Sequence, residues 1–212
     1  GSTGGSTANS SHTYDVEKAL TANGFERKYT VTYKHNYTGS TDTTRIATYT
    51  FNKWNTAQNG TGTEYTNGQS VTNLSSTNGA TVNLYAIWNS SSVTYSPTRT
   101  GYTFAGWFEN EVCTGTRVDT NGVFTPTANK TLYAKWTANG VSYKVQHWKQ
   151  NLTGDASLHD NTNYTLADTD ILTEAADGQV TPAVKTYAGF TAPVTQTVTV
   201  KADGSLVVNY YY

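Results

Sequence analysis

The sequence predicts a mainly β chain organised as small modules in tandem. Thr, Asn, Gly, Ser and Tyr dominate the composition, and these residues favour strands and tight turns. Apolar and polar residues alternate with period two in several segments after Tyr29, as they do in half-buried strands. A Tyr-Thr-Phe-x-x-Trp motif occurs twice, at residues 49–54 and 102–107, which indicates a repeated unit.

Composition and charge exclude several classes of protein. The 212 residues can hold one to three domains, and 13% aromatic residues supply apolar surface for small cores. A net charge of −1 offers no basic face to nucleic acid. No apolar run is long enough to cross a bilayer, so no membrane insertion is expected. The single cysteine, Cys113, cannot form a disulfide within the chain and is expected to be an inert thiol.

The N-terminal residues differ in composition from the remainder. Residues 1–12 read GSTGGSTANSSH, which is typical of a flexible linker. Asp15 can cap a helix over residues 16–22, and Gly24 can end it. The prediction for residues 1–28 is therefore a flexible arm with room for one short helix.

Three strands are expected in the stretch that follows. Residues 28–37 and 45–54 alternate with period two, and residues 80–88 read as a third strand. Residues 56–71 are rich in turn signals, with Asn-Gly pairs of the kind found in β-hairpins. These segments make up a first predicted module over residues 29–89.

A second copy of the same frame follows. When Phe51 is aligned with Phe104, Trp54 falls on Trp107, and both frames close with Leu-Tyr-Ala-x-Trp. The second predicted module therefore spans residues 90–138. Large rings supply much of the apolar area that so small a module can bury. The predicted structural core residues are Phe51, Trp54, Tyr85, Trp88, Phe104, Trp107, Tyr133 and Trp136.

The last third of the chain has a different pattern. Residues 142–152 alternate as a strand, and residues 173–191 contain a turn and can form a short helix. A hairpin is predicted from residues 197–201 and 205–210, joined by an Ala-Asp-Gly turn. A third β module is expected over residues 139–212.

These motifs resemble a known family. The Gly-Tyr-Thr-Phe-Ala-Gly-Trp at 101–107, with the Leu-Tyr-Ala-Lys-Trp that follows it, resembles the internalin B-type repeat, also called the Listeria–Bacteroides repeat. Residues 49–88 resemble a second copy, in which Lys53 stands at the position of Gly106. Residues 143–212 are similar to the mucin-binding-type repeats that often follow such units.

The resemblance implies small β-grasp-like modules in large extracellular proteins of bacteria, mostly anchored to the cell surface. The predicted fold class is thus mainly β, with tandem β-grasp-like modules. The partners it implies are other surface protein modules or host and environmental glycans.

Sequence motifs of enzymes and cofactor sites are absent. The chain has no Gly-x-Ser-x-Gly, His-Glu-x-x-His, Cys-x-x-Cys or phosphate-binding glycine loop, so we predict no catalytic residues, no cofactor and no enzyme. One local group of acidic residues and histidine is either a solvated loop or a weak cation site. The solvated loop is favoured because the spacing fits no calcium loop, and no metal site is predicted. The group comprises Asp155, His159, Asp160, Asp168 and Asp170.

Three roles remain open. The leading hypothesis is a non-catalytic bacterial surface protein that acts as a repeat stalk, an adhesin segment or an assembly subunit. The second is a glycan- or mucin-binding module, in which exposed rings stack on sugars. At least one of Tyr210, Tyr211 and Tyr212 is expected to face outward and to be available for contacts. The third is a homopolymeric filament, joined by strand addition from the 1–28 arm or the final strand at 205–212.

Overall fold

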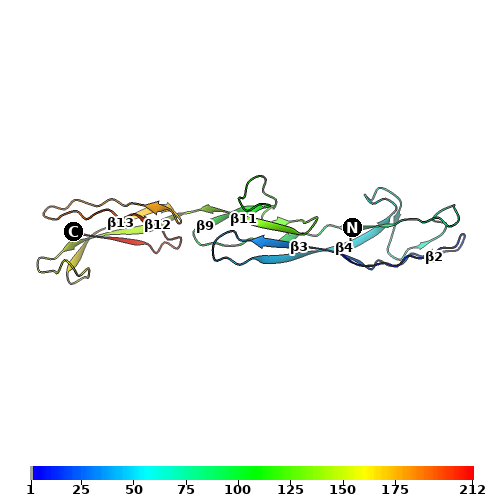
Figure 1. The fold of residues 1–212 in the computed structure, drawn as a ribbon, viewed down its shortest axis with the longest axis horizontal. Helices are drawn as coiled ribbons and strands as arrows, with labels where there is room; N and C mark the ends of the chain where they lie inside the picture. The colour runs from blue at the N-terminus through cyan, green and yellow to red at the C-terminus, as the bar shows by residue number, and fades with distance from the viewer. Residues whose placement is uncertain (1) are drawn as a thin grey trace. The chain divides into compact units, whose positions relative to one another are not determined.

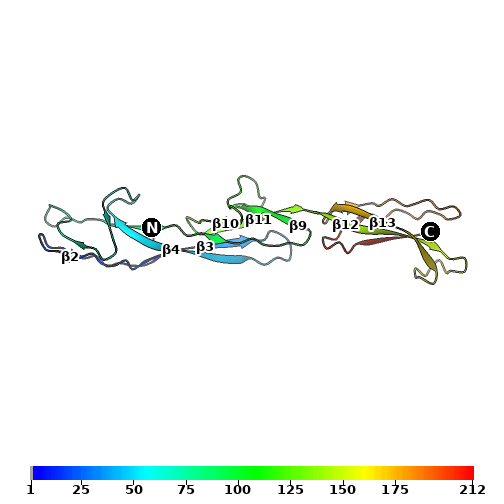
Figure 2. The same cartoon turned by 180° about the vertical axis from the view of Figure 1, so that it is seen from behind.

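The computed structural model describes residues 2–212, and all regular structure among them is β, which confirms the predicted fold class (Figures 1 and 2). No helix occurs among these residues. The strands are β1 (Gly4–Gly5), β2 (Lys18–Ala19), β3 (Phe25–Lys34), β4 (Thr43–Asn55), β5 (Glu64–Tyr65), β6 (Ser70–Val71), β7 (Tyr85–Asn89), β8 (Val93–Thr94), β9 (Tyr102–Phe108), β10 (Val123–Phe124), β11 (Lys130–Ala138), β12 (Gly140–Gln150), β13 (Tyr164–Ala175), β14 (Gln179–Val180), β15 (Val198–Thr199) and β16 (Val207–Tyr211).

The chain folds as two compact units. The first unit consists of the residues up to Ser96 together with Gly106–Lys135. The second unit consists of Pro97–Ala105 and Trp136–Tyr212. The chain therefore passes from one unit to the other three times inside the second repeat: between Ser96 and Pro97, within strand β9 and within strand β11.

The main sheet joins the two repeats. Its strand order is β5-β4-β3-β11-β9, with β1 also paired to β3 and β7 to β4. Strand β3 lies antiparallel to β4 on one side and parallel to β11 on the other, where Val31 is opposite Lys130 (Figures 1 and 2). Because β3 belongs to the predicted 29–89 module and β11 to the 90–138 module, the two repeats share one sheet.

Side chains of both repeats meet in one core. On β3, alternation places Val31 and Tyr33 inward, and both are fully buried. The ring of Tyr33 lies 4.6 Å from that of Trp107 and 5.1 Å from that of Tyr95. Burial raises the pKa of the Tyr33 phenol to about 12, since the phenolate would lose its hydration. The second repeat thus depends on a strand of the first for its core.

The predicted N-terminal helix is absent, and the arm is paired with the first repeat. Strand β1 pairs with β3, and β2 pairs with β6. Asp15 has a φ of 55°, which is outside the helical region, and its N–H donates to Asn73 Oδ1 at 2.7 Å. Leu20 is buried in a cluster with Trp54 and Val71. Tertiary pairing and burial of Leu20 therefore outweigh the weak helical preference of residues 16–22.

The second unit contains a three-stranded sheet in the order β13-β12-β16, with β12 and β13 side by side in both views (Figures 1 and 2). Strands β12 and β13 are antiparallel, with a register shift between His147 and Trp148. The sequence did not predict β13, although its β-branched residues favour a strand. The buried core residues of this unit are Tyr143, Val145, Val200, Val208, Tyr210 and Tyr212.

The hairpin and the short helix predicted near the C-terminus are wrong. The turn exists, with Gly204 N–H donating to Lys201 O at 2.9 Å, but its two arms do not pair with each other. Strand β15 pairs with β14, and β16 pairs in parallel with β12. The parallel pairing lets Val208 and Tyr210 join the core that β12 lines. Residues 173–191 form the end of β13, strand β14 and an extended segment in place of a helix.

Candidate functional site

Asp119 organises the loop that follows the second motif. Its Oδ1 accepts hydrogen bonds from Trp107 N–H (2.6 Å) and Arg117 Nε (2.9 Å). Its Oδ2 accepts from Gly122 N–H (2.7 Å) and from the Arg117 guanidinium (2.6 Å). Burial pushes the pKa of the Asp119 carboxyl upward, but the bonds from Arg117 and the two backbone N–H groups outweigh it and hold this pKa below its ordinary value.

Glycine at position 106 makes room for this arrangement. Gly106 has a φ of 123°, which L side chains rarely adopt, and a Cβ there would lie 2.5 Å from Arg117 Cδ. The first repeat has Lys53 at this position and uses a different polar residue, Asn55. Asn55 Oδ1 accepts from the N–H groups of Ala57 and Gly62 at 2.8 and 2.9 Å. In each repeat, one buried polar side chain therefore holds the loop that follows the Tyr-Thr-Phe-x-x-Trp strand by hydrogen bonds to its backbone.

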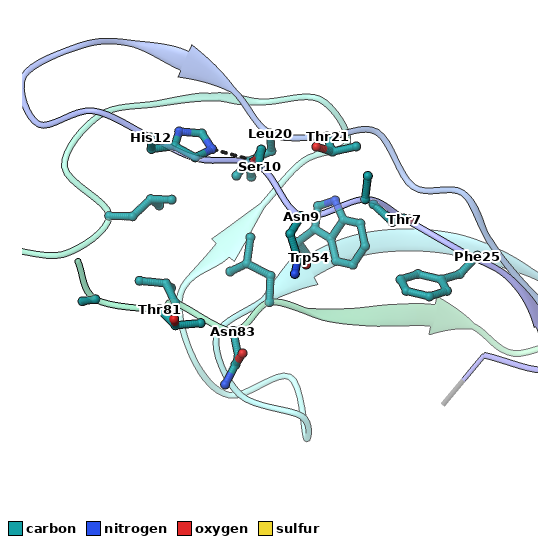
Figure 3. Close-up of a pocket in the computed structure, with 15 residues that line it drawn as sticks. Thr7, Asn9, Ser10, His12, Leu20, Thr21, Phe25, Trp54, Thr81 and Asn83 are labelled. Carbon is teal, nitrogen blue, oxygen red and sulfur yellow. Dashed lines mark hydrogen bonds between the residues drawn. The ribbon is translucent and has the colours of Figure 1, made fainter.

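A pocket of about 390 Å³ lies beside Trp54 in the first unit (Figure 3). Its walls come from the segments 7–12, 20–25 and 80–84, together with Trp54 and Leu74. The lining contains no Asp, Glu, Lys or Arg. The pocket therefore combines aromatic and aliphatic surface with hydroxyl, amide and imidazole groups.

Two lining side chains have buried nitrogen atoms without a hydrogen-bond partner. Trp54 is only 4% exposed, and its Nε1–H has no acceptor. His12 Nε2 lies 2.9 Å from Ser10 Oγ, whereas its buried Nδ1 has no partner. Phe25 packs edge-on against Trp54 with ring centroids 6.2 Å apart. Because buried polar groups almost always have partners, the two nitrogen atoms distinguish this pocket from ordinary surface hollows.

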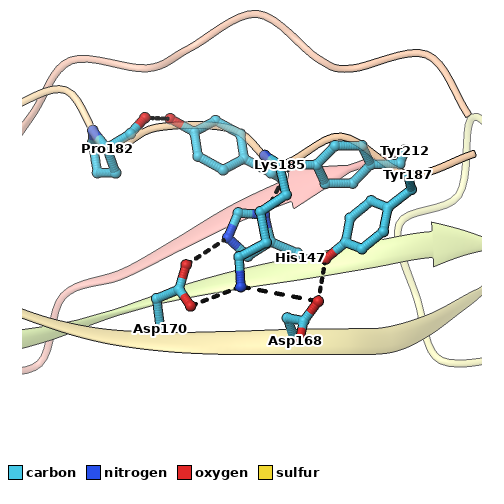
Figure 4. A network of polar contacts seen from close by, with 8 residues as sticks. His147, Asp168, Asp170, Pro182, Lys185, Tyr187 and Tyr212 are labelled. Carbon is cyan, nitrogen blue, oxygen red and sulfur yellow. Dashed lines mark hydrogen bonds and ion pairs between the residues drawn. The ribbon is translucent and has the colours of Figure 1, made fainter.

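A polar network forms a second cluster in the second unit (Figure 4). His147 is fully buried on β12; its Nδ1 lies 2.8 Å from Tyr212 Oη and its Nε2 lies 3.2 Å from Asp170 Oδ2. Lys185 Nζ donates to Asp170 Oδ1 at 2.7 Å, and Tyr187 Oη donates to Asp168 Oδ2 at 2.5 Å. Sequence reasoning singled out Asp168 and Asp170 but did not connect them to His147 or Lys185, because these residues are far apart in the chain.

The network joins strands through hydrogen bonds and ion pairs. The hydrogen bond from Lys185 holds the pKa of Asp170 below its ordinary value, and the same bond raises the pKa of Lys185. Burial, followed by the hydrogen bond to Asp168, raises the pKa of the Tyr187 phenol. Lys185 N–H also donates to Tyr212 Oη at 2.7 Å. The charged and hydroxyl groups are thus engaged with one another and tie residues 185–187 to β12, β13 and the C-terminus.

The eight predicted core residues differ in burial. Trp54 and Trp107 are buried, whereas Tyr85 is 37% exposed and lies outside the core. Alternation explains this correction, because Leu84 and Ala86 on either side of Tyr85 pack against the Trp54 cluster. The half-buried members are Phe51, Trp88, Phe104, Tyr133 and Trp136.

The predicted contact residues at the C-terminus are mostly in the core. Tyr210 is fully buried and Tyr212 is 7% exposed, because alternation along β16 turns both rings inward. Only Tyr211 is half-buried, and its ring stacks on His159 at 3.9 Å. Tyr210 and Tyr212 are therefore not available as surface contacts.

The predicted acidic group is divided. Asp168 and Asp170 belong to the His147 network, while Asp155 and Asp160 accept hydrogen bonds within their own turns. Within residues 2–212, no three His, Cys, Asp or Glu side chains are grouped so that they could hold a metal ion. None of these residues forms a helix long and apolar enough to cross a bilayer.

Cys113 is buried within the second repeat, and we expect it to react slowly with thiol reagents. It is 6% exposed, Asn36 Nδ2 lies 3.4 Å from its Sγ, and burial raises the pKa of the thiol. Labelling of the native chain with a chromogenic disulfide should be roughly 100-fold slower than labelling in denaturant. Cys113→Ser provides the blank. A native rate equal to that of the denatured chain would place the thiol on the surface.

Comparison with known proteins identifies the repeats. A family model described as the Listeria-Bacteroides repeat domain matches the chain twice, over residues 13–87 and 77–135, which confirms the predicted two copies. The first match begins within the predicted 1–28 arm. No curated protein and no solved structure matches the chain. The matches end at residue 135, so the resemblance of residues 139–212 to mucin-binding-type repeats stays a prediction, as does the narrower description as internalin B-type.

Proposed function

Because this chain belongs to the Listeria-Bacteroides repeat family, we propose that it is a non-catalytic stalk segment of an extracellular bacterial surface protein. This family consists of repeat domains found typically in bacterial surface proteins, which supports an extracellular location. The observation that supports a stalk in particular is the parallel pairing of β3 with β11. A stalk has to transmit force without coming apart, and a sheet shared by two repeats leaves no free linker between them.

Contacts outside the backbone ladder reinforce the joint between the repeats. Thr30 N–H donates to Asn129 Oδ1 at 2.9 Å. Asn36 Nδ2 donates to Ala134 O at 3.2 Å, and Tyr49 Oη donates to Pro126 O. Separating the repeats would break these bonds together with the strand pairing and would expose Tyr33. The two repeats are thus expected to unfold as one cooperative body.

Self-assembly by strand addition is the less favoured role. The N-terminal residues that would serve as a donor strand already pair with β3 and β6 of the same chain. Strand β13 is an edge of its sheet, and it carries Asp168, Asp170 and Glu174. Charges on an edge strand disfavour pairing with another chain.

Stretching the intact chain between its two ends in optical tweezers tests the stalk proposal. The first unit should resist force and then unfold in one step that releases both repeats together. A Gly/Ser chain of equal length, as the control, should extend smoothly. Two separate unfolding steps for residues 29–89 and 90–138, or smooth extension like the control, would contradict the proposal.

A further inference from the structure

We propose that the pocket beside Trp54 binds a neutral sugar unit of a glycan. The inference is independent of the stalk role, because it concerns a ligand site in the first unit rather than the joint between repeats. Its volume of about 390 Å³ falls within the range of roughly 300–1,000 Å³ that is usual for small-ligand sites. It is therefore large enough to enclose one or two sugar rings.

The charge of the lining limits the class of ligand. With no Asp, Glu, Lys or Arg in the walls, no carboxylate, ammonium or guanidinium group would offset the desolvation of a charged ligand. Anionic and cationic ligands are therefore disfavoured. A neutral ligand can lose its water here without leaving an ion unpaired.

The polar groups select against a purely apolar ligand. Among residues 2–212, four buried side-chain nitrogen or oxygen atoms lack a hydrogen-bond partner, and two of them, Trp54 Nε1 and His12 Nδ1, belong to this pocket. An indole N–H is only a donor, so it needs an acceptor from the ligand. A hydrocarbon would leave both nitrogen atoms unpaired, which costs free energy.

Sugar hydroxyl groups meet these requirements together. Each hydroxyl donates and accepts, so different hydroxyl groups of one ligand can serve Trp54 Nε1 and also Asn83 and Thr81, which lie next to each other in Figure 3. The C–H face of a pyranose ring matches the apolar surface that Phe25, Leu74 and Leu84 present. A neutral saccharide is thus the class of ligand whose polar and apolar surfaces both fit.

Indole N–H signals in an NMR spectrum of the full chain provide a direct test. The probes are maltotriose, cellotriose, mannotriose, N-acetylchitotriose and N-acetyllactosamine, each added at millimolar concentration. At least one probe should move the Trp54 indole signal in a saturable way, because the ligand oxygen becomes its acceptor. Trp54→Phe identifies that signal by removing it while keeping an aromatic ring.

Two variants test whether the shift reports the pocket. Measured by isothermal titration calorimetry, Asn83→Ala should weaken the Kd about five- to tenfold, and Trp54→Phe should do the same, which corresponds to the loss of one hydrogen bond to the ligand. Asn52→Ala is the matched control, because Asn52 is exposed on β4 and does not line the pocket. It should leave the Kd unchanged.

Several outcomes would overturn the proposal. One is that no probe moves the Trp54 signal, which would show that no sugar supplies an acceptor to the indole N–H. Another is saccharide binding that Asn83→Ala leaves intact, which would place the sugar elsewhere. A third is that an uncharged oligopeptide, such as tetraalanine with an acetylated N-terminus and an amidated C-terminus, saturates the same signal while every sugar fails. If Trp54→Phe fails to fold, Asn83→Ala alone decides the outcome.

Discussion

Replacing Trp107 by alanine is expected to lower the free energy of unfolding of the first unit by about 3–5 kcal/mol, the usual cost of removing a large core ring. Trp107 is fully buried, packs against Tyr33 and Tyr95, and donates its Nε1–H to Tyr95 O at 2.8 Å. The substitution removes this packing and leaves a partly buried carbonyl without its donor. Chemical denaturation followed by circular dichroism measures the loss.

The effect should spread across both repeats. Tyr33 lies on β3 of the first repeat, so the cavity left by Trp107→Ala opens directly beside the strand that joins the two repeats. One unfolding transition at a lower denaturant concentration is therefore expected, with no residual stable first repeat. A first repeat that stays folded after the second has unfolded would show that the shared sheet does not couple them.

Two further substitutions separate the contributions. Trp107→Phe keeps a ring but removes the donor to Tyr95 O, and it should cost about 1–3 kcal/mol. Val112→Ala changes a side chain that is 80% exposed and should cost less than about 0.5 kcal/mol. A loss for Trp107→Ala as small as that for Val112→Ala would contradict the burial of the ring.

Sequence reasoning succeeded where short periodic signals decide the structure. The alternation in residues 28–37, 45–54 and 142–152 predicted β3, β4 and β12 to within a few residues. The aligned tryptophans of the two motifs, Trp54 and Trp107, are both buried. These features depend on residues within one strand or one motif, which a pattern of period two reports directly.

These local signals could not predict which strands pair when the strands are far apart in the sequence. Nothing in the alternation of β3 or β11 states that the two strands pair, because they are about one hundred residues apart, as the contact from Thr30 to Asn129 illustrates. The Ala-Asp-Gly turn at the C-terminus suggested a hairpin, but β12 provided the partner of β16. A local turn reverses the direction of the chain, but packing in the core determines which strand the following strand pairs with.

The candidate sites were missed for the same reason. The Trp54 pocket takes its walls from the segments 7–12, 20–25 and 80–84, which only the pairing of β2 with β6 and the packing around Leu20 bring together. Likewise, the network of His147 needs β13 beside β12. No motif of fixed spacing could have revealed either cluster.

Removing the Asp119 carboxylate should destabilise the first unit by about 2–4 kcal/mol, because the N–H groups of Trp107 and Gly122 would lose their acceptor in a buried position. Asp119→Ala tests this by the same denaturation measurement. Glu109→Ala is the matched control: Glu109 pairs with Lys130 at the surface, and its loss should cost about 0–1 kcal/mol. Equal losses for the two variants would show that Asp119 does not hold the loop.

The same carboxylate should make stability depend on acid. Since the pKa of Asp119 is lower in the folded than in the unfolded chain, its contribution is complete well above the ordinary value of about 3.9. It is lost as the pH falls through that value towards the lower folded-state pKa, because the unfolded chain takes up the proton first. Asp119→Asn cannot take up this proton, and its amide N–H₂ would face the N–H of Gly122 in place of an acceptor. The unfolding free energy of this variant should therefore be lower at neutral pH and fall less between about pH 5 and pH 2 than that of the unsubstituted protein. If the two curves of unfolding free energy against pH stay parallel over that range, other carboxylates are responsible for the acid sensitivity.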